Sequence, residues 1–195
     1  MKTSILAVVV TACLTAASGA ATVLADKVVV TRTTAFPPAF HIAEVQVFEQ
    51  GTGTNVAASA AGSSAAASST GWGTSPAWAI DGNTDGAFGS NSTWHDTDGE
   101  GGDNPGMIDQ LTITFSSPKS VDNFNLWGRT DCCPERDDSI RVEFFNGATL
   151  VGQVDTGIIN NFNTGVTPIT AVVPEPASGI LALALAGLMW RRRRV

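Results

Sequence analysis

The residues with the clearest potential for chemistry lie in one short segment, Arg-Thr-Asp-Cys-Cys-Pro-Glu-Arg at positions 129–136. Two adjacent cysteines, Cys132 and Cys133, stand between two arginines, and the only other cysteine, Cys13, lies in an apolar run at the N-terminus. A disulfide between neighbouring cysteines closes a strained eight-membered ring, and local strain is found where a site needs a rigid surface. The alternative is a pair of free thiols in an acidic surface loop.

Arginines on both sides of such a ring suit a neutral, hydroxyl-rich ligand. Arg129 and Arg136 would each present a planar fork of N–H donors that bridges two oxygens. Asp131 would hold an arginine in position, and the flat sulfur face of Cys132 and Cys133 would support the apolar edge of a sugar ring. Because a disulfide-bonded cysteine is no nucleophile, the segment predicts saccharide binding rather than covalent catalysis.

The N-terminus has the pattern of a secretory signal. Lys2 precedes an apolar run over positions 5–17, and small residues at 18–20 or at 23–25 offer a cleavage site. We predict a signal peptide over residues 1–25; a lipoprotein cleavage box at 10–13 is the alternative. Export would place the chain in an oxidising compartment, which permits the Cys132–Cys133 disulfide.

The C-terminus has three parts: Pro174, Glu175 and Pro176, an apolar run, and four arginines at 191–194. As a helix the apolar run covers only about 20 Å of a hydrocarbon core of about 30 Å, and the arginines should stay cytoplasmic. This ending resembles the PEP-CTERM sorting signal, whose Pro-Glu-Pro motif is read by an exosortase. The resemblance implies that residues 173–195 are a transient inner-membrane anchor, and that an exosortase-type enzyme releases the protein to the cell surface or beyond.

The remaining residues, 26–172, have the length of one domain and an acidic composition. The full chain has a net charge of −7, and five of its 11 basic residues, Lys2 and the four terminal arginines, lie in the two ends. An acidic surface argues against nucleic acid and anionic lipid as partners. It fits neutral partners and calcium.

Short alternating segments predict that this domain is all-β. Apolar residues recur at every second position in 41–47, 111–115 and 140–144, while the segment 27–33 is rich in β-branched residues. No part of the domain carries the apolar stripe of a helix. The Ala/Ser-rich stretch 57–70 fits either a flexible linker or a small-residue strand. We expect a β-sandwich.

The segment 129–136, preceded by His95, resembles the fucose-binding signature of F-type lectins, which belong to the discoidin or galactose-binding-like superfamily. The residues Trp-Ala-Ile-Asp-Gly-Asn-Thr-Asp-Gly at 78–86 are similar to the Asp-Gly-Asn loop of such domains. The resemblance implies a jelly-roll fold that binds a terminal fucose or a similarly configured sugar. It assigns polar sugar contacts to His95, Arg129 and Arg136.

The order of the motifs departs from that family. The segment 40–48 resembles the family's closing strand, yet it precedes the Asp-Gly-Asn loop. A circular permutation is the simplest account, because the termini of such a domain lie close together at its surface. We then expect the strand around Glu44 to pair beside the final strands. The stretch 96–107 is longer than in the family, which puts the contact from His95 in doubt.

The segment 81–86 also predicts a calcium site. It offers carboxylate, amide and carbonyl oxygens on a sharp turn, which are the ligands that a hard cation takes. The resemblance implies a structural calcium at this loop. Its expected ligands are Asp81, Asn83, Asp85, Ser92 and Glu44. The alternative is a metal-free turn in which Asx side chains bond their own backbone. A second acidic stretch, 96–103, better fits a solvated loop.

Two function classes remain for the domain. The arginine segment favours a sugar-binding module, and the long stretch after His95 favours a matrix or adhesion protein that uses the sandwich as a scaffold. Trp94 and Trp127 offer stacking platforms for a sugar, although a strand tryptophan is more often core. The many carboxylates leave a paired-acid glycosidase open, but a domain of this kind is usually a binding module. We therefore predict a non-enzymatic, carbohydrate-binding protein at the cell surface or on extracellular polysaccharide.

Overall fold

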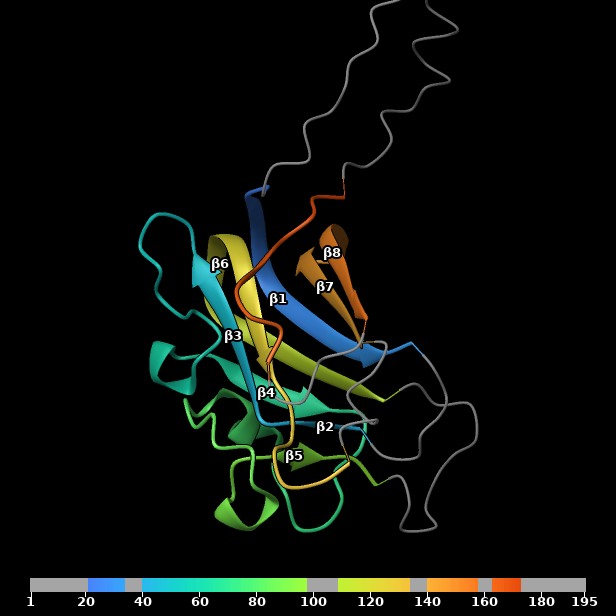
Figure 1. Ribbon diagram of the computed structural model, residues 1–195. Coiled ribbons are helices and arrows are strands. Elements are labelled where there is room, and N and C mark those ends of the chain that lie inside the picture. Colours follow the sequence, from blue (N-terminus) through green and yellow to red (C-terminus); the bar gives the residue numbers. More distant parts are fainter. Residues whose placement is uncertain (1–20, 34–39, 98–108, 134–139, 158–162, 173–195) are drawn as a thin grey trace, which may run out of the picture.

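The computed structural model describes residues 21–33, 40–97, 109–133, 140–157 and 163–172 (Figure 1). Regular structure in these ranges consists of β-strands and short 3-10 helices. The strands are β1 (Val23–Arg32), β2 (His41–Ile42), β3 (Glu44–Glu49), β4 (Ser64–Ala67), β5 (Trp94–His95), β6 (Gln110–Trp127), β7 (Ile140–Asn146), β8 (Thr149–Gly157) and β9 (Thr167–Pro168). The 3-10 helices are η1 (Ser59–Ala61), η2 (Pro76–Ile80) and η3 (Phe88–Ser90). The predicted all-β class is confirmed.

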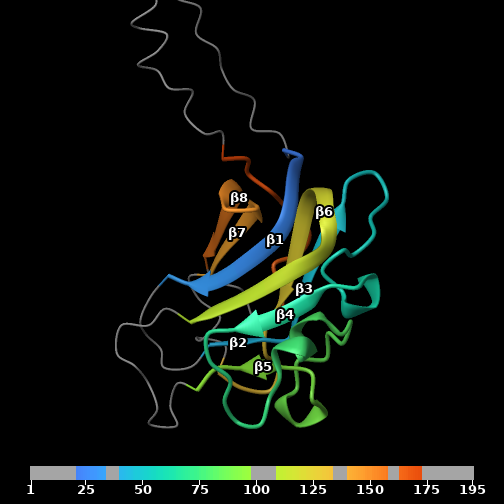
Figure 2. The same cartoon turned by 180° about the vertical axis from the view of Figure 1, so that it is seen from behind.

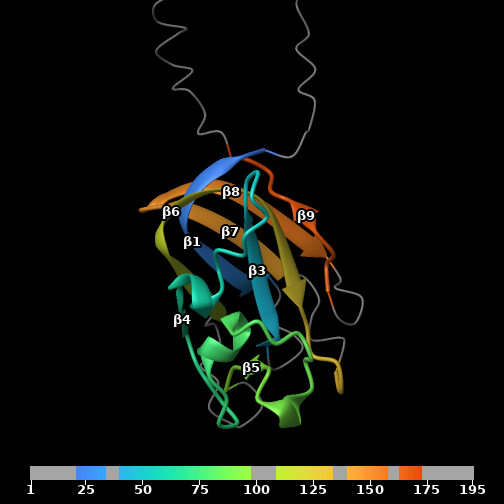
Figure 3. The ribbon, with the colours of Figure 1, turned by 90° about the vertical axis from the view of Figure 1, so that its left-hand side faces the viewer.

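The long strand β6 organises the sheets. Its first half pairs with β1 on one side and β4 on the other, and β7 and β8 continue the sheet beyond β1. Its second half, 121–127, pairs with β3 and, at 123–124, with β9. The strand curves between the two halves, so the chain forms a sandwich-like pair of layers (Figures 2 and 3). The two-residue strands β2 and β5 form a separate small pair.

The core follows the alternation seen in the sequence. Successive residues of a strand face opposite sides, so every second residue can enter the core. The buried apolar residues of the central strands are Val28 and Val30 in β1, Val45 and Val47 in β3, Leu111, Ile113 and Phe115 in β6, and Ile140, Val142 and Phe144 in β7. Burial of these side chains supplies the main stabilisation, at roughly 25 cal/mol per Å² of apolar surface.

The first strand begins earlier than the predicted domain boundary. Val23 and Ala25 are buried, and Val23 lies opposite Val121 of β6. The backbone N–H of Ala21 also donates to the carbonyl of Ile169 at 3.2 Å. The boundary between residues 25 and 26 therefore falls inside β1. Cleavage after the small residues at 18–20 leaves the whole strand in place.

Two further expectations are decided by strand pairing. Within the Ala/Ser-rich stretch, residues 64–67 form β4 and pair with β6, so a strand rather than a linker occupies this part. The strand around Glu44, β3, pairs with residues 121–127 of β6. We expected it to pair beside the final strands, and for β7 and β8 that expectation is wrong. The last strand, β9, pairs with the same half of β6.

The two ends of the described chain lie at one end of the sandwich, where Val172 bonds to Val151 and Ala21 to Ile169. The segment 128–133, the 3-10 helices η2 and η3, and the β2–β5 pair lie at the opposite end (Figures 1 and 3). The described chain thus ends at Val172, at the opposite end from the loops that carry Arg129. Across the described ranges, no helix is long and apolar enough to span a membrane.

Candidate functional site

The segment that carries Arg129 is held against the Asp-Gly-Asn loop. Thr130 donates its N–H to the carbonyl of Gly86 at 3.0 Å and its hydroxyl to the carbonyl of Asp85 at 2.8 Å. Gly86 has a φ of +70°, and a Cβ at that position would lie 2.7 Å from the carbonyl oxygen of Gly128. Only glycine fits such a close approach with this backbone conformation. The two loops therefore form one unit.

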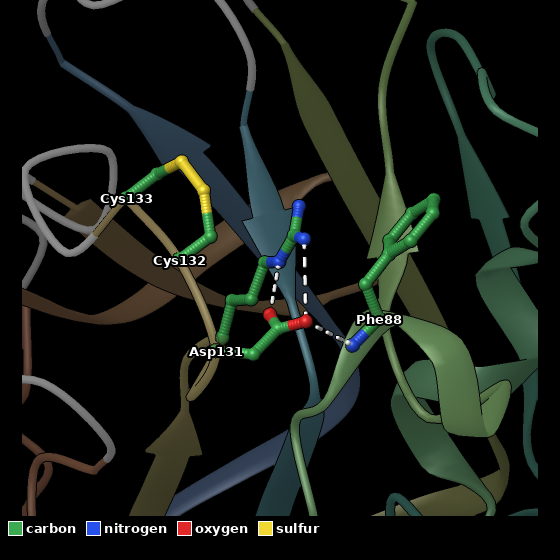
Figure 4. The surroundings of a disulfide bond; sticks show 5 residues. Phe88, Asp131, Cys132 and Cys133 are labelled. Atoms are coloured by element: carbon green, nitrogen blue, oxygen red, sulfur yellow. Dashed lines mark hydrogen bonds and ion pairs between the residues drawn. A yellow bond between two sulfur atoms is a disulfide. The ribbon is translucent and has the colours of Figure 1, made fainter.

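Asp131 fixes the orientation of Arg129. The Nε and Nη2 atoms of Arg129 donate to the two carboxylate oxygens of Asp131 at 2.5 and 3.4 Å. The same carboxylate accepts the backbone N–H of Phe88 at 3.3 Å (Figure 4). Hydrogen bonding from Arg129 lowers the pKa of Asp131, so the aspartate is ionised at neutral pH. The guanidinium also lies over the Phe88 ring, 4.6 Å from its centre. Two contacts of different kinds thus hold one planar donor fork.

Cys132 and Cys133 are joined by a disulfide directly after Asp131. In Figure 4 the sulfurs lie on one side of Asp131 and the Phe88 ring on the other. Cys133 has a φ of 60°, in the left-handed region that residues other than glycine seldom adopt. Both cysteines are half-buried, so part of each remains accessible to a ligand.

We predict that Cys132 and Cys133 are oxidised to each other in the exported protein. Export supplies an oxidising compartment, and removal of the signal peptide takes away Cys13. Alkylation of freshly purified protein, followed by intact-mass measurement without reductant, should label no thiol. The same sample treated with reductant first should gain two labels. Two labels without reductant would contradict the prediction.

His95 lies beneath the surface rather than on it. It is 2% exposed, and its Nδ1 atom lies 2.9 Å from the backbone oxygen of Asp96. Its ring packs against His41, Trp72 and Phe88, with ring centres 5.6, 5.8 and 6.0 Å away. His95 is therefore buried among aromatic rings, and the structure does not expose it for the sugar contact that the resemblance implies. Arg136 lies outside the described residues.

The two expected stacking platforms are parts of the fold. Trp94 is fully buried, packs edge-on against Phe40 at 5.5 Å and donates its indole N–H to the carbonyl of Ser69. Trp127 is half-buried on β6 and donates to the side chain of Gln46 at 3.3 Å. Trp94 therefore cannot stack on a sugar and is a core residue.

The sequence analysis did not single out Phe88 or Trp72. Each stands next to glycine: Phe88 begins η3 and precedes Gly89, and Trp72 lies in a turn between Gly71 and Gly73. A large aromatic residue next to glycine could have marked these positions in the sequence, because its immediate neighbours offer few apolar side chains to pack against. Trp72 is 51% exposed.

The loop 81–86 has the hydrogen bonds of Asx turns. The carboxylate of Asp81 accepts the N–H of Asn83 at 2.7 Å, and the amide oxygen of Asn83 accepts the N–H of Asp85 at 3.1 Å. Ser92 donates to the carbonyl of Ala87 at 3.2 Å. Within the described part of the chain, no three His, Cys, Asp or Glu side chains are grouped to hold a metal ion. A cation here would need further oxygen ligands, such as the amide of Asn83, the hydroxyl of Ser92 or backbone carbonyls.

Glu44 is the member of the expected calcium set that reaches the loop from a distant strand. It is fully buried, and its Oε2 atom accepts the N–H of Gly82 at 3.2 Å. Its Oε1 atom is buried without a hydrogen-bond partner. Burial, with the nearby charge of Asp81 as a smaller cause, raises the pKa of Glu44 to about 8. A buried carboxylate oxygen without a partner is costly, and a cation would offset that cost.

Comparison with known proteins identifies the C-terminal segment. Residues 172–194 match the PEP-CTERM protein-sorting motif, so the predicted sorting signal is confirmed. Pro174, Glu175 and Pro176 of this motif lie outside the described residues. It implies an exported protein with a membrane-anchored sorting tail that an exosortase-type enzyme processes. No curated protein and no solved structure matches the chain.

Proposed function

We propose that this exported PEP-CTERM protein carries a non-enzymatic sugar-binding domain, and that its ligand is a glycan ending in fucose or a similarly configured sugar. One observation carries the proposal: the Arg129 guanidinium is oriented by Asp131 and Phe88 beside the Cys132–Cys133 disulfide. A fixed donor fork beside an apolar, polarisable surface matches the two faces of a pyranose, which are hydroxyl-rich edges and an apolar patch of C–H groups.

Each residue contributes to binding without breaking a bond in the ligand. Arg129 donates to a ring oxygen and a neighbouring hydroxyl, and Arg136 is the expected second fork. The charge of Asp131 keeps Arg129 oriented before the sugar arrives, which lowers the entropic cost of binding. Phe88 and the sulfurs of Cys132 and Cys133 offer the apolar surface. His95 supports Phe88 from behind instead of contacting the sugar.

Calcium at the loop 81–86 is part of the proposal as a structural ion. The orphaned Oε1 atom of Glu44 supports it, and oxygens of the loop would complete the set of ligands. A cation there would fix the loop, and the loop holds Thr130 next to Arg129. The ion would therefore act on sugar binding only through the position of Arg129.

A calcium-stabilised scaffold for matrix or adhesion is the second candidate. The burial of His95 favours it, because one of the three polar sugar contacts implied by the F-type lectin resemblance is not at the surface. Val172, the last described residue, lies at the far end of the sandwich from the segment 128–133, which suits both candidates equally (Figure 1).

The full chain, purified oxidised from the producing cells, decides between the candidates. We expect a glycan array to show fucose-terminated glycans, and calorimetry with L-fucose to give a weak but measurable affinity. Chelation of calcium should weaken the signal and calcium should restore it. A folded, oxidised, calcium-loaded protein with no array signal and no heat would leave the scaffold function.

A further inference from the structure

Trp72 occupies an unusual position in a tight turn. The N–H of Thr74 donates to the carbonyl of Gly71 at 3.0 Å, and the two central residues, Trp72 and Gly73, have φ angles of 56° and 69°. This combination is that of a type I′ turn, whose central positions favour glycine, asparagine and aspartate. A bulky aromatic residue with positive φ is a strained exception, and such exceptions gather at functional sites.

The turn is fixed to β5 by several contacts. Gly71 donates its N–H to the carbonyl of His95 at 2.9 Å, and the hydroxyl of Thr74 accepts the N–H of His95 at 3.1 Å. A Cβ on Gly71 would lie 2.3 Å from the backbone oxygen of Asp96, so the turn sits directly on the strand end. Trp72 is therefore held in one place while half of its surface stays open to solvent.

A continuous row of side chains links Trp72 to the proposed sugar site. The Trp72 ring lies against His95, the His95 ring against Phe88, and Phe88 beneath the guanidinium of Arg129. Strained backbone marks the same region. Among the described residues, those other than glycine with positive φ are Trp72, Asn91 and Cys133. Asn91 ends the 3-10 helix that carries Phe88, and Cys133 follows Asp131.

We infer that Trp72 is a second contact surface, on which an inner sugar ring of an oligosaccharide stacks while the terminal sugar binds at Arg129. This inference rests on the proposed function. An open indole face offers a large, rigid, apolar surface at low entropic cost, and a pyranose presents a flat C–H face to it. Three successive side-chain contacts, with 5.8, 6.0 and 4.6 Å between centres, link Trp72 to Arg129, and a di- or trisaccharide can extend over contacts of this length.

The test compares the affinity for a monosaccharide with the affinity for two trisaccharides. Calorimetry on the full, oxidised chain would use L-fucose, 2′-fucosyllactose and 3-fucosyllactose, which extend fucose through different linkages. The key variant is Trp72→Asn, because asparagine accepts a positive φ and should keep the turn. We expect unchanged affinity for L-fucose and a loss of about tenfold for at least one trisaccharide. Trp72→Phe should keep most of the trisaccharide affinity, since it retains an aromatic face.

Each result separates this inference from the proposed function. Equal trisaccharide affinity in wild type and Trp72→Asn would overturn the stacking role while leaving the Arg129 site intact. Equal loss for L-fucose and the trisaccharides would also overturn it, because Trp72 would then only support the site through His95. A wild-type chain that binds none of the three sugars overturns both proposals.

Discussion

Arg129→Ala should abolish measurable binding of L-fucose. The guanidinium is the one described donor fork at the site, and Asp131 and Phe88 hold it in place before any ligand arrives. Loss of one hydrogen bond from a charged donor costs about 1.5–3 kcal/mol, or roughly tenfold to more than a hundredfold in affinity. For a site that binds weakly, this loss moves the affinity out of the measurable range.

Conservative variants separate the shape of the donor from its charge. Arg129→Lys keeps the positive charge but replaces a planar fork with a point charge, so it should lose most of the affinity. Asp131→Asn should weaken binding less, because Phe88 still lies beneath the guanidinium. Calorimetry with L-fucose measures all three variants, and circular dichroism checks that each remains folded.

The chain offers a matched control for these variants. Arg141 on β7 and Asp155 on β8 form an exposed pair with the same two-point geometry, at 2.7 and 3.1 Å. Arg141→Ala removes an arginine–aspartate pair of the same kind from the β7–β8 strand pair. It should leave sugar affinity unchanged. Equal loss from Arg141→Ala and Arg129→Ala, or wild-type affinity in Arg129→Ala, would contradict a role for Arg129 in binding.

The sequence predicted the strands best where burial alternates. In residues 111–115 and 140–144, every second residue is apolar because one face of each strand packs into the core. This period of two is visible in the sequence. The curvature of β6 has no such local signature. It lets one strand serve two layers, and for that reason the partner of the Glu44 strand could not be read from order along the chain.

The candidate site was predictable to the extent that it is local. Arg129, Asp131 and the two cysteines are neighbours in sequence, so their grouping follows from the sequence alone. The burial of His95 depends on Trp72, Phe88 and His41, which come from three separate segments. Contacts of this kind arise from tertiary packing, which local propensity does not encode.

Glu44→Gln should change how stability depends on pH in the absence of calcium. The folded-state pKa of Glu44 is about 8, above its ordinary value of 4.5, because burial disfavours the charged carboxylate. Between these two values the folded chain holds a proton that the unfolded chain has released. The stability that Glu44 contributes is therefore complete below about pH 4.5 and is lost as the pH rises through 8. In chelator, the melting temperature of wild type should fall over this range, and that of Glu44→Gln should fall less.

At pH 8, calcium should raise the melting temperature of wild type more than that of Glu44→Gln. A cation at the loop 81–86 favours the ionised carboxylate, so its binding to wild type should release a proton and should tighten as the pH rises. The variant has a neutral amide in place of the carboxylate, and its melting temperature should respond little to calcium. Scanning calorimetry in chelator and in calcium, from pH 5 to 8.5, measures both effects. Binding of the ion to the folded state alone raises stability with calcium concentration.

Glu49→Gln is the control on the same strand. Glu49 is partly exposed and lies 3.7 Å from Lys119, so it shares the residue type and the strand with Glu44 but not the burial. Its variant should keep the pH dependence and the calcium response of wild type. A Glu44→Gln chain that gains as much from calcium as wild type would remove Glu44 from the ion site. The Oε1 atom of Glu44 would then be only a costly buried group without a partner. The pH dependence of the wild-type melting temperature in chelator would still show that Glu44 is buried and not an exposed glutamate.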